Sequence, residues 1–217
     1  MISYTRIIDI SRPVNSSSAC FPGDVPFSRS ITLSYAASKI VNLTSLTMSP
    51  HVGTHADAPA HIKGDLASGQ DLVGDLVLEP YLGACRVFDL APFDGELKVE
   101  QVDALANAVA PLPERVLFRT QPRVDHAVFE KNGSYFSPEF VREMARRGVR
   151  LLGIDTASVD RTDSQTLDAH HALDEANMFW LENLDLSDVA SGDYFLIALP
   201  VKFTELEASP VRAVLLV

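Results

Sequence analysis

Short apolar runs separated by polar turns dominate this chain, and they predict strands. Runs of strand length occur at 82–90, 115–120, 150–155, 194–201 and 211–217. A short apolar run between turn signals is typical of a strand buried in a sheet. β-rich segments predict further strands at 4–10, 28–35 and 41–49.

Helical signals are concentrated in three segments. Residues 99–109 carry apolar side chains at helical spacing, namely Val99, Val102, Leu105, Ala106 and Val109. Residues 137–148 begin with a serine cap, a proline and an acid, and end with two arginines and a glycine, as helices commonly do. A third helix is predicted over about 165–176. Strands and helices mix, which predicts an α/β or α+β fold with a mixed sheet.

Size and charge limit the classes of protein that fit. The chain has 217 residues, which fits a single domain over 1–217 and is long enough to bury a core. Hydrophobic residues make up 47%, so the composition is that of a folded chain. The formal net charge of -11 argues against binding to nucleic acid or to an anionic membrane.

Cysteine usage and hydropathy favour a cytoplasmic protein. Cys20 and Cys85 lie far apart and form no C-x-x-C pair, so we expect two unpaired buried thiols in a reducing compartment. The first residues lack the basic start and apolar stretch of a signal peptide. No run approaches the roughly 18 apolar residues of a membrane span.

The segment 51–61, HVGTHADAPAH, carries four ligand-type side chains. His51, His55, Asp57 and His61 all fall at odd positions. In an extended backbone, side chains two residues apart share a face, so a strand-like run would point all four at one place. Imidazole and carboxylate groups together suit Zn²⁺ or Mn²⁺. The segment therefore predicts a metal or catalytic site.

A helical H-E-x-x-H metalloprotease site is the alternative for His51 and His55, which are four residues apart. Pro50, Gly53 and Pro59 bracket and interrupt the segment, and no glutamate follows the first histidine. Both facts argue against a helix. The chain also lacks a G-x-S-x-G nucleophile elbow, a P-loop and a G-x-G-x-x-G loop.

Further ligands must come from elsewhere in the chain. In a helix, adjacent side chains point about 100° apart, so only one of His170 and His171 should face the site. Glu182 follows four large apolar residues, and a buried carboxylate of this kind needs a partner or a metal. Asp155, at a strand end, is either a site residue or a turn cap, and His126 is expected at the surface.

The segment 49–61 resembles the H-x-G-x-H-x-D-x-P-x-H signature of the metal-dependent cyclase superfamily. Within it, the match is closest to the bacterial kynurenine formamidases, or arylformamidases. The resemblance extends to segments throughout the chain, at 21–27, 150–156, 166–173, 181–184, 191–200 and 208–215. It implies a mixed, barrel-like α/β fold of the swivelling β/β/α type, usually assembled as a homodimer.

The resemblance also implies a role for each site residue. His51, His55 and Asp57 would bind a first zinc ion. Asp57 and Glu182 would bridge to a second zinc ion, which His170 also holds. His61 would be the acid/base group. Mn²⁺ in place of zinc is compatible with these ligands.

The activity implied is hydrolysis of N-formyl-L-kynurenine to L-kynurenine and formate by a metal-activated water. Phe21 stands where the family commonly has a substrate-stacking tryptophan, and it keeps an aromatic face but loses the indole N–H. Another aryl or cyclic amide hydrolase of the superfamily, such as a Mn²⁺-dependent isatin hydrolase, is therefore one alternative. A non-catalytic metal-binding protein is the other.

Overall fold

A mixed sheet forms the centre of the computed structural model, which describes residues 4–106 and 111–217. Within these residues, nine strands follow the order β1-β13-β11-β5-β7-β9-β10-β4-β12. In that order they are Ile7–Asp9, Val214–Leu216, Gly192–Ile197, Leu82–Asp89, Arg115–Arg119, Leu151–Ile154, Phe179–Glu182, His55–Asp57 and Ala208–Pro210.

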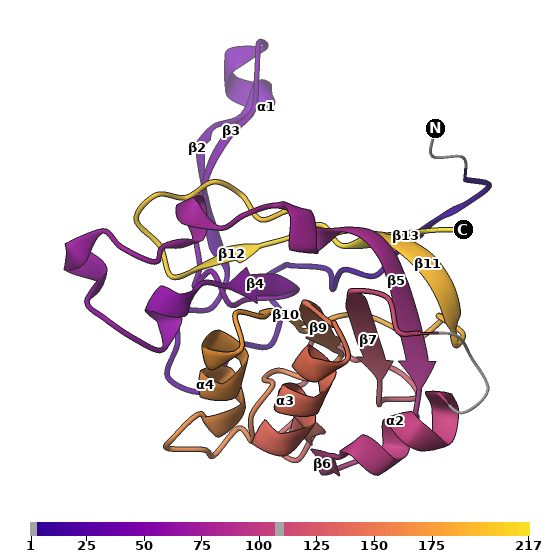
Figure 1. Ribbon diagram of the computed structural model, residues 1–217. Coiled ribbons are helices and arrows are strands. Elements are labelled where there is room, and N and C mark those ends of the chain that lie inside the picture. Colours follow the sequence, from indigo (N-terminus) through magenta and orange to yellow (C-terminus); the bar gives the residue numbers. More distant parts are fainter. Residues whose placement is uncertain (1–3, 107–110) are drawn as a thin grey trace.

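Four adjacent strands, β5, β7, β9 and β10, are parallel, and the flanking pairs are antiparallel. One helix connects each parallel pair, as parallel pairing requires a long crossover. These helices are α2 (Val99–Ala106), α3 (Pro138–Arg146) and α4 (Asp168–Glu175). They lie together on one side of the parallel strands (Figure 1). The predicted α/β class with a mixed sheet is confirmed.

The parallel strands are buried on both faces, which explains their continuous apolar sequences. On β7, Val116 and Phe118 pack in the cluster under the helices, whereas Leu117 between them packs in the cluster on the opposite face. On β9, Leu152 likewise packs in the cluster under the helices, and Leu151 packs in the cluster on the opposite face. Each such side chain contributes roughly 1.5–3 kcal/mol by leaving water.

The three predicted helices agree with the structure to different extents. The Ser137 side chain accepts a hydrogen bond from the Phe140 N–H at 3.0 Å, and α3 ends just before Gly148, whose φ is +87°, so both predicted ends are confirmed. Residues 107–109 of the first predicted helix, 99–109, lie outside the described residues. The third predicted helix is shorter at its start, because Leu167 has a φ of 49° and cannot continue a helix.

Several strand predictions need correction. The strand predicted at 194–201 instead covers Gly192–Ile197, and Pro200 lacks the N–H that a ladder needs. Strand β10 was not predicted, although its strand-type run Phe179–Glu182 is apolar apart from the final carboxylate. The short strands β12, β6 (Glu96–Leu97) and β8 (Tyr135–Phe136) were also missed.

A hairpin stands away from the body of the molecule (Figure 1). It consists of β2 (Ser28–Leu33), the short helix α1 (Tyr35–Ser38) and β3 (Leu43–Thr47), and both strands are exposed throughout. The remaining elements are short 3-10 turns, η1 to η4, at Pro59–His61, Leu66–Ser68, Val73–Asp75 and Glu79–Tyr81.

Both cysteines are free, as expected, but only Cys85 is buried, because Cys20 lies in a partly exposed loop. Within the described residues, no helix has the length and apolar character needed to cross a membrane.

Candidate active site

The histidine segment reaches its site by three different local structures. His55 and Asp57 lie two apart on β4 and so share a face, but His51 lies in the preceding turn and His61 ends the 3-10 turn η1. The predicted single extended run is therefore wrong. Gly53 has a φ of +77°, and a Cβ there would lie 2.6 Å from the Val14 side chain, so this tight turn requires glycine. The turn brings His51 back toward the strand.

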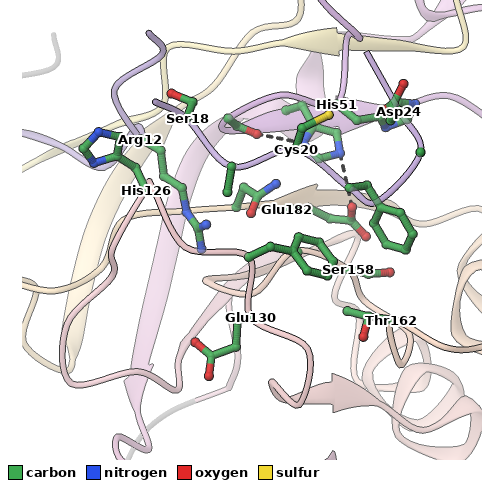
Figure 2. A pocket seen from close by; sticks show the side chains of 18 of the residues that line it. Arg12, Ser18, Cys20, Asp24, His51, His126, Glu130, Ser158, Thr162 and Glu182 are labelled. Carbon is green, nitrogen blue, oxygen red and sulfur yellow. Dashed lines mark hydrogen bonds and ion pairs between the residues drawn. The ribbon is translucent and has the colours of Figure 1, made fainter. Parts of the chain in front are cut away.

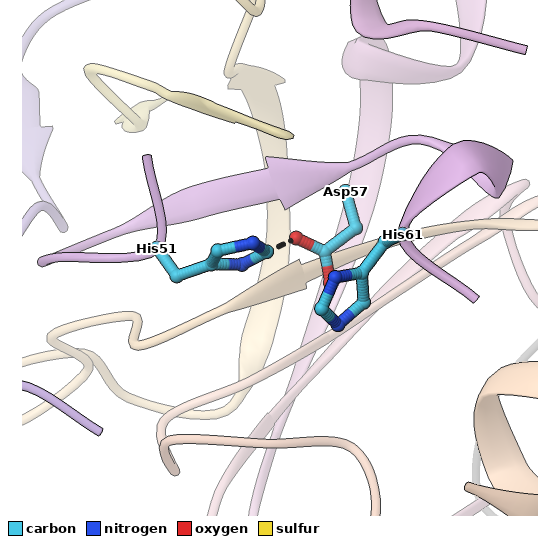
Figure 3. A group of neighbouring side chains, drawn as sticks. All are labelled: His51, Asp57 and His61. Atoms are coloured by element: carbon cyan, nitrogen blue, oxygen red, sulfur yellow. Dashed lines mark ion pairs between the residues drawn. The ribbon is translucent and has the colours of Figure 1, made fainter. Parts of the chain in front are cut away.

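The three histidine side chains of the segment nevertheless converge on the Asp57 carboxylate, which is fully buried. Its Oδ1 lies 3.1 Å from His51 Nδ1 and 3.4 Å from His55 Nε2. Figure 3 shows the rings of His51 and His61 on two sides of this carboxylate. The His51 and His61 ring centroids are 4.5 Å apart.

Two residues more than 100 positions away complete the cluster. Strand β10 pairs with β4 so that Glu182 lies opposite His55, and Glu182 Oε2 is 3.2 Å from His55 Nε2. His170, on α4, places its Nε2 3.4 Å from Glu182 Oε1 and 3.6 Å from Asp57 Oδ2. His170 is buried and His171 is exposed, so one of the adjacent pair faces the site, as predicted.

The buried imidazoles of His55 and His170 are each held by a hydrogen bond at the ring nitrogen that points away from the cluster. The Nδ1–H of His55 donates to the Gly53 carbonyl at 2.9 Å, and the Nδ1–H of His170 donates to Asp160 Oδ2 at 2.7 Å. Each bond keeps a proton on Nδ1, so Nε2 is the nitrogen that is directed inward and can give up its proton to a metal. Asp160 also accepts hydrogen bonds from the backbone N–H groups of Ala169 and His170, so it is itself held by the start of α4.

The carboxylates are held in the same manner. The indole N–H of Trp180 donates to Asp57 Oδ2 at 2.9 Å, and the backbone N–H of Val159 donates to Glu182 Oε1 at 2.7 Å. Trp180 is itself buried, and its ring meets the His170 ring edge-on at 5.4 Å. The orientation of each carboxylate is therefore set by the surrounding core.

Three atoms at the centre of the cluster are buried and have no hydrogen-bond partner among the described residues: His55 Nε2, His170 Nε2 and Asp57 Oδ1. Unsatisfied buried polar atoms are costly, so their convergence suits a bound cation, which would satisfy all three. The ligand atoms of His55, Asp57 and Glu182 lie within 4.8 Å of one another. A second group with the same property combines Asp57 with His51 and His61. Nitrogen and oxygen donors in this arrangement fit Zn²⁺ or Mn²⁺.

The electrostatics of the cluster also favour positive charge. Burial lowers the pKa of His51, but the nearby carboxylates of Asp57 and Glu207 outweigh it and raise the pKa to about 10. Burial likewise opposes protonation of His170, yet its carboxylate partners raise its pKa to about 10. A site whose carboxylates hold protons on imidazoles is one in which a divalent cation can displace those protons.

His61 differs from the other histidines. Burial lowers its pKa, and the neighbouring His51 and His170 lower it further against the opposing effect of Asp57. Its ring centroid lies 5.6 Å from that of His170. A neutral imidazole beside the cluster can accept a proton, and it can equally serve as a ligand through the group that it forms with His51 and Asp57.

A cavity of about 540 Å³ opens over the cluster (Figure 2). His51, His55, His61, His170 and Glu182 line one part of it. The rest is formed by loops that carry Phe21, Phe129 and Arg12. Phe21, predicted to contact substrate, lies in the wall and meets Phe129 edge-on, with ring centroids 5.2 Å apart.

Phe129 and Arg12 are among the lining residues that were not predicted, and His126 was misplaced. Phe129 and Arg12 come from segments without a motif, although an aromatic residue in the polar loop 121–133 was a usable signal. His126 was expected at the surface without partners, but it lines the cavity, and its Nε2 lies 3.4 Å from the Asn15 amide nitrogen. Loops from distant parts of the chain meet here, and local patterns cannot place them.

Asp155 is a turn cap. Its carboxylate accepts hydrogen bonds from the Thr120 N–H and hydroxyl and from the Gln121 N–H, at 2.6–2.9 Å. Burial raises its pKa against the opposing effect of these hydrogen bonds. All of these contacts join the segments that follow β7 and β9, so Asp155 acts as a turn cap and not as a site residue.

Comparison with known proteins identifies the family. Residues 8–161 match the family model described as putative cyclase. The chain belongs to this cyclase family. The kynurenine formamidase of Bordetella pertussis is 44% identical to this cyclase-family protein over 210 residues, which are 97% of each chain. That of Delftia acidovorans is 42% identical over 97% of each chain.

Solved structures share the fold of this family member. Isatin hydrolase A from Labrenzia aggregata superimposes with a TM-score of 0.81 at 24% identity and covers 98% of this chain and 93% of its own. A predicted metal-dependent hydrolase from Bacillus stearothermophilus gives a TM-score of 0.79 at 24% identity, with 97% of each chain covered. At this identity the likeness concerns the fold, and it agrees with the barrel-like swivelling architecture expected of the family.

Proposed function

We propose that this cyclase-family protein is a metal-dependent arylformamidase that hydrolyses N-formyl-L-kynurenine to L-kynurenine and formate. The observation that carries the proposal is the 44% identity, over nearly the full length, to a kynurenine formamidase. The convergence of four histidines and two carboxylates beneath a cavity supports it independently. The isatin hydrolases share the fold at 24% identity or less, which supports isatin only as an alternative substrate within the family.

We propose that the cluster holds two zinc ions, with Mn²⁺ as the alternative metal. The residues that would hold the ions are His51, His55, Asp57, His170 and Glu182. The unpartnered nitrogens of His55 and His170 support this assignment. When bound, the metal would supply Lewis acidity, which lowers the pKa of water and polarises a carbonyl oxygen.

His61 is the proposed acid/base residue. The formyl carbon carries only hydrogen and is open to attack by water, and a neutral imidazole beside the cluster can take the proton that water loses. The same imidazolium then donates this proton to the aniline nitrogen as the C–N bond breaks, releasing formate and the arylamine.

Phe21 and Phe129 are the proposed contacts to the aryl ring. Both line the cavity that contains the histidines, and their rings pack edge-on against each other. An aryl ring that packs on this pair would be fixed relative to His61, and orientation of the reacting bond is a large part of catalysis.

A homodimer is the proposed assembly, and the hairpin β2–α1–β3 is the proposed contact. Its strands expose Ile31, Leu33, Leu43 and Leu46, and Ile40 beyond α1 is 82% exposed. A two-stranded ribbon with apolar residues on both faces is marginally stable alone in water, so a second copy of the chain would stabilise it. Light scattering measures the mass of each protein in solution and tests this. We expect a dimer for the wild type and a monomer for Leu46→Asp.

A cytoplasmic location remains a prediction.

The decisive test of the activity is a side-by-side assay with N-formyl-L-kynurenine and isatin. We expect the enzyme to turn over the formamide faster than isatin. This activity should be lost after dialysis against a chelator and restored by Zn²⁺ or Mn²⁺. Preference for isatin would replace the proposal with the alternative substrate. Metal binding without turnover of either compound would favour the non-catalytic reading.

A further inference from the structure

Arg12 occupies an unusual position in the cavity wall. Its backbone N–H donates to the Thr54 hydroxyl at 2.8 Å, which ties it to the turn between His51 and His55. Its side chain extends into the cavity (Figure 2). One guanidinium nitrogen, Nη2, donates to the Asp155 backbone carbonyl, whereas Nε is buried without a partner among the described residues.

No carboxylate pairs with Arg12 among the described residues, which sets it apart from the other arginines that are not exposed. The others each pair with an acid: Arg86 with Asp193, Arg115 with Glu114, Arg119 with Asp89, and Arg147 with Asp103 and Glu143. A partly buried cation without an anionic partner is costly to maintain. Its retention beside a cavity points to a partner that the protein itself does not supply.

The charge of Arg12 is available to such a partner. Burial lowers its pKa to about 10, against the more distant charges of Asp155, Asp185 and Glu130, so the side chain remains a cation at neutral pH. Arg161 also lines the cavity, but its guanidinium already makes two bonds to Asp163, each 2.9 Å long, at an exposed position. Arg12 is therefore the cation of this cavity with unused capacity for an anion.

We propose that Arg12 binds a carboxylate on the substrate, so that the enzyme selects aryl formamides that carry an acidic side chain. This inference rests on the proposed function and deepens it. The histidines, Arg12 and the Phe21–Phe129 pair all line this one cavity. A substrate with its formamide at the histidines and its ring on the phenylalanines would extend its side chain toward Arg12.

The test compares two substrates that differ only in the carboxylate. N-formyl-L-kynurenine has it, and the decarboxylated analogue keeps the ring, the formamide and the ammonium group. The variants are Arg12→Gln, Arg12→Lys and, as the matched control, Arg161→Gln. Because a hydrogen bond to a charged group is typically worth a factor of about 10 to 100, Arg12→Gln should lower kcat/KM for the carboxylate substrate by that factor, mainly through KM.

The same variant should change kcat/KM for the decarboxylated analogue by less than about 3-fold, and Arg12→Lys should restore part of the loss because it keeps the charge. Arg161→Gln should leave the ratio of the two substrates unchanged. An equal loss on both substrates would overturn the inference and assign Arg12 a structural role, which a lowered melting temperature would accompany. Absence of turnover of both compounds by the wild type would instead overturn the proposed function.

Discussion

The two ends of the cavity are built differently. At the deep end, Asp57 and Glu182 lie on adjacent strands, are almost fully buried, and have their orientation fixed by hydrogen bonds from Trp180 and Val159. At the mouth, Phe21 lies in a loop and is 42% exposed. The deep end is therefore rigid because its side chains belong to the core, whereas the mouth depends on loops that the core does not constrain.

This difference separates the chemistry from the choice of substrate. A change at the deep end removes a ligand or leaves a buried charge unpaired, so it should affect every substrate alike. A change at the mouth alters contacts with only one part of the substrate, so its effect should depend on which substrate is tested. Substitutions at the two ends therefore test whether catalysis and substrate choice are separate.

Glu182→Gln is expected to have the largest effect. The amide keeps the volume and the bond from Val159 but removes the negative charge that faces His55 and His170. Loss of metal should cost kcat on the order of 10³-fold or more, for all substrates, because metal catalysis is worth several kcal/mol. Elemental analysis should find less metal per chain than in the control Glu175→Gln, an exposed acid. An unchanged metal content would contradict the proposed ligand role.

His61→Asn should lower kcat by about 10²- to 10⁴-fold, the usual range for loss of an acid/base group. Metal content should stay at the wild-type level, because the proposed ligands are intact. His171→Asn, on an exposed face of α4, is the matched control and should be silent. Loss of metal from the His61 variant would show that His61 is a ligand, as its group with His51 and Asp57 permits.

Asp160→Asn tests whether a residue behind the cluster sets its affinity for metal. The asparagine oxygen, placed at the Oδ2 position, can still accept from the His170 N–H, but the Ala169 N–H loses the acceptor that Oδ1 provided. The start of α4 therefore keeps one of its two bonds to this side chain, and the helix should fold. The weaker acceptor for His170 Nδ1–H should reduce metal affinity by about 10- to 100-fold. Titration of the apo-protein with Zn²⁺ measures this directly, and Asp163→Asn serves as an exposed control. Equal affinities would limit Asp160 to capping the helix.

The same division explains what could be predicted from sequence. His55 and Asp57 were placed correctly because spacing within one strand decides which face they share. His170 and Glu182 depended on the family resemblance, since only the pairing of β10 with β4 brings Glu182 opposite His55. Most residues at the mouth of the cavity were not predicted from the sequence. Arg12, for example, follows β1, and tertiary packing alone brings it to the cavity.

Exchanging Phe21 should have the smallest effect, and the effect should be confined to contacts with the aryl ring of the substrate. Aromatic contacts of this kind are worth about 0.5–1.5 kcal/mol, so Phe21→Leu should lower kcat/KM for N-formyl-L-kynurenine by roughly 2- to 10-fold. Phe21→Trp should match or exceed the wild type, because the site is partly exposed and open toward the cavity, with room for a larger ring. Phe203→Leu, an exposed phenylalanine outside the cavity lining, is the control.

Neither change at Phe21 should alter the metal content, since Phe21 contacts Phe129 and none of the proposed ligands. The informative quantity is the ratio of kcat/KM for N-formyl-L-kynurenine to that for formanilide, which has a ring but no side chain. If loss of the ring at Phe21 weakened both substrates equally, it would act on the aryl group alone. If it also lowered bound metal, the mouth and the deep end would be coupled, and the separation between specificity and chemistry would fail.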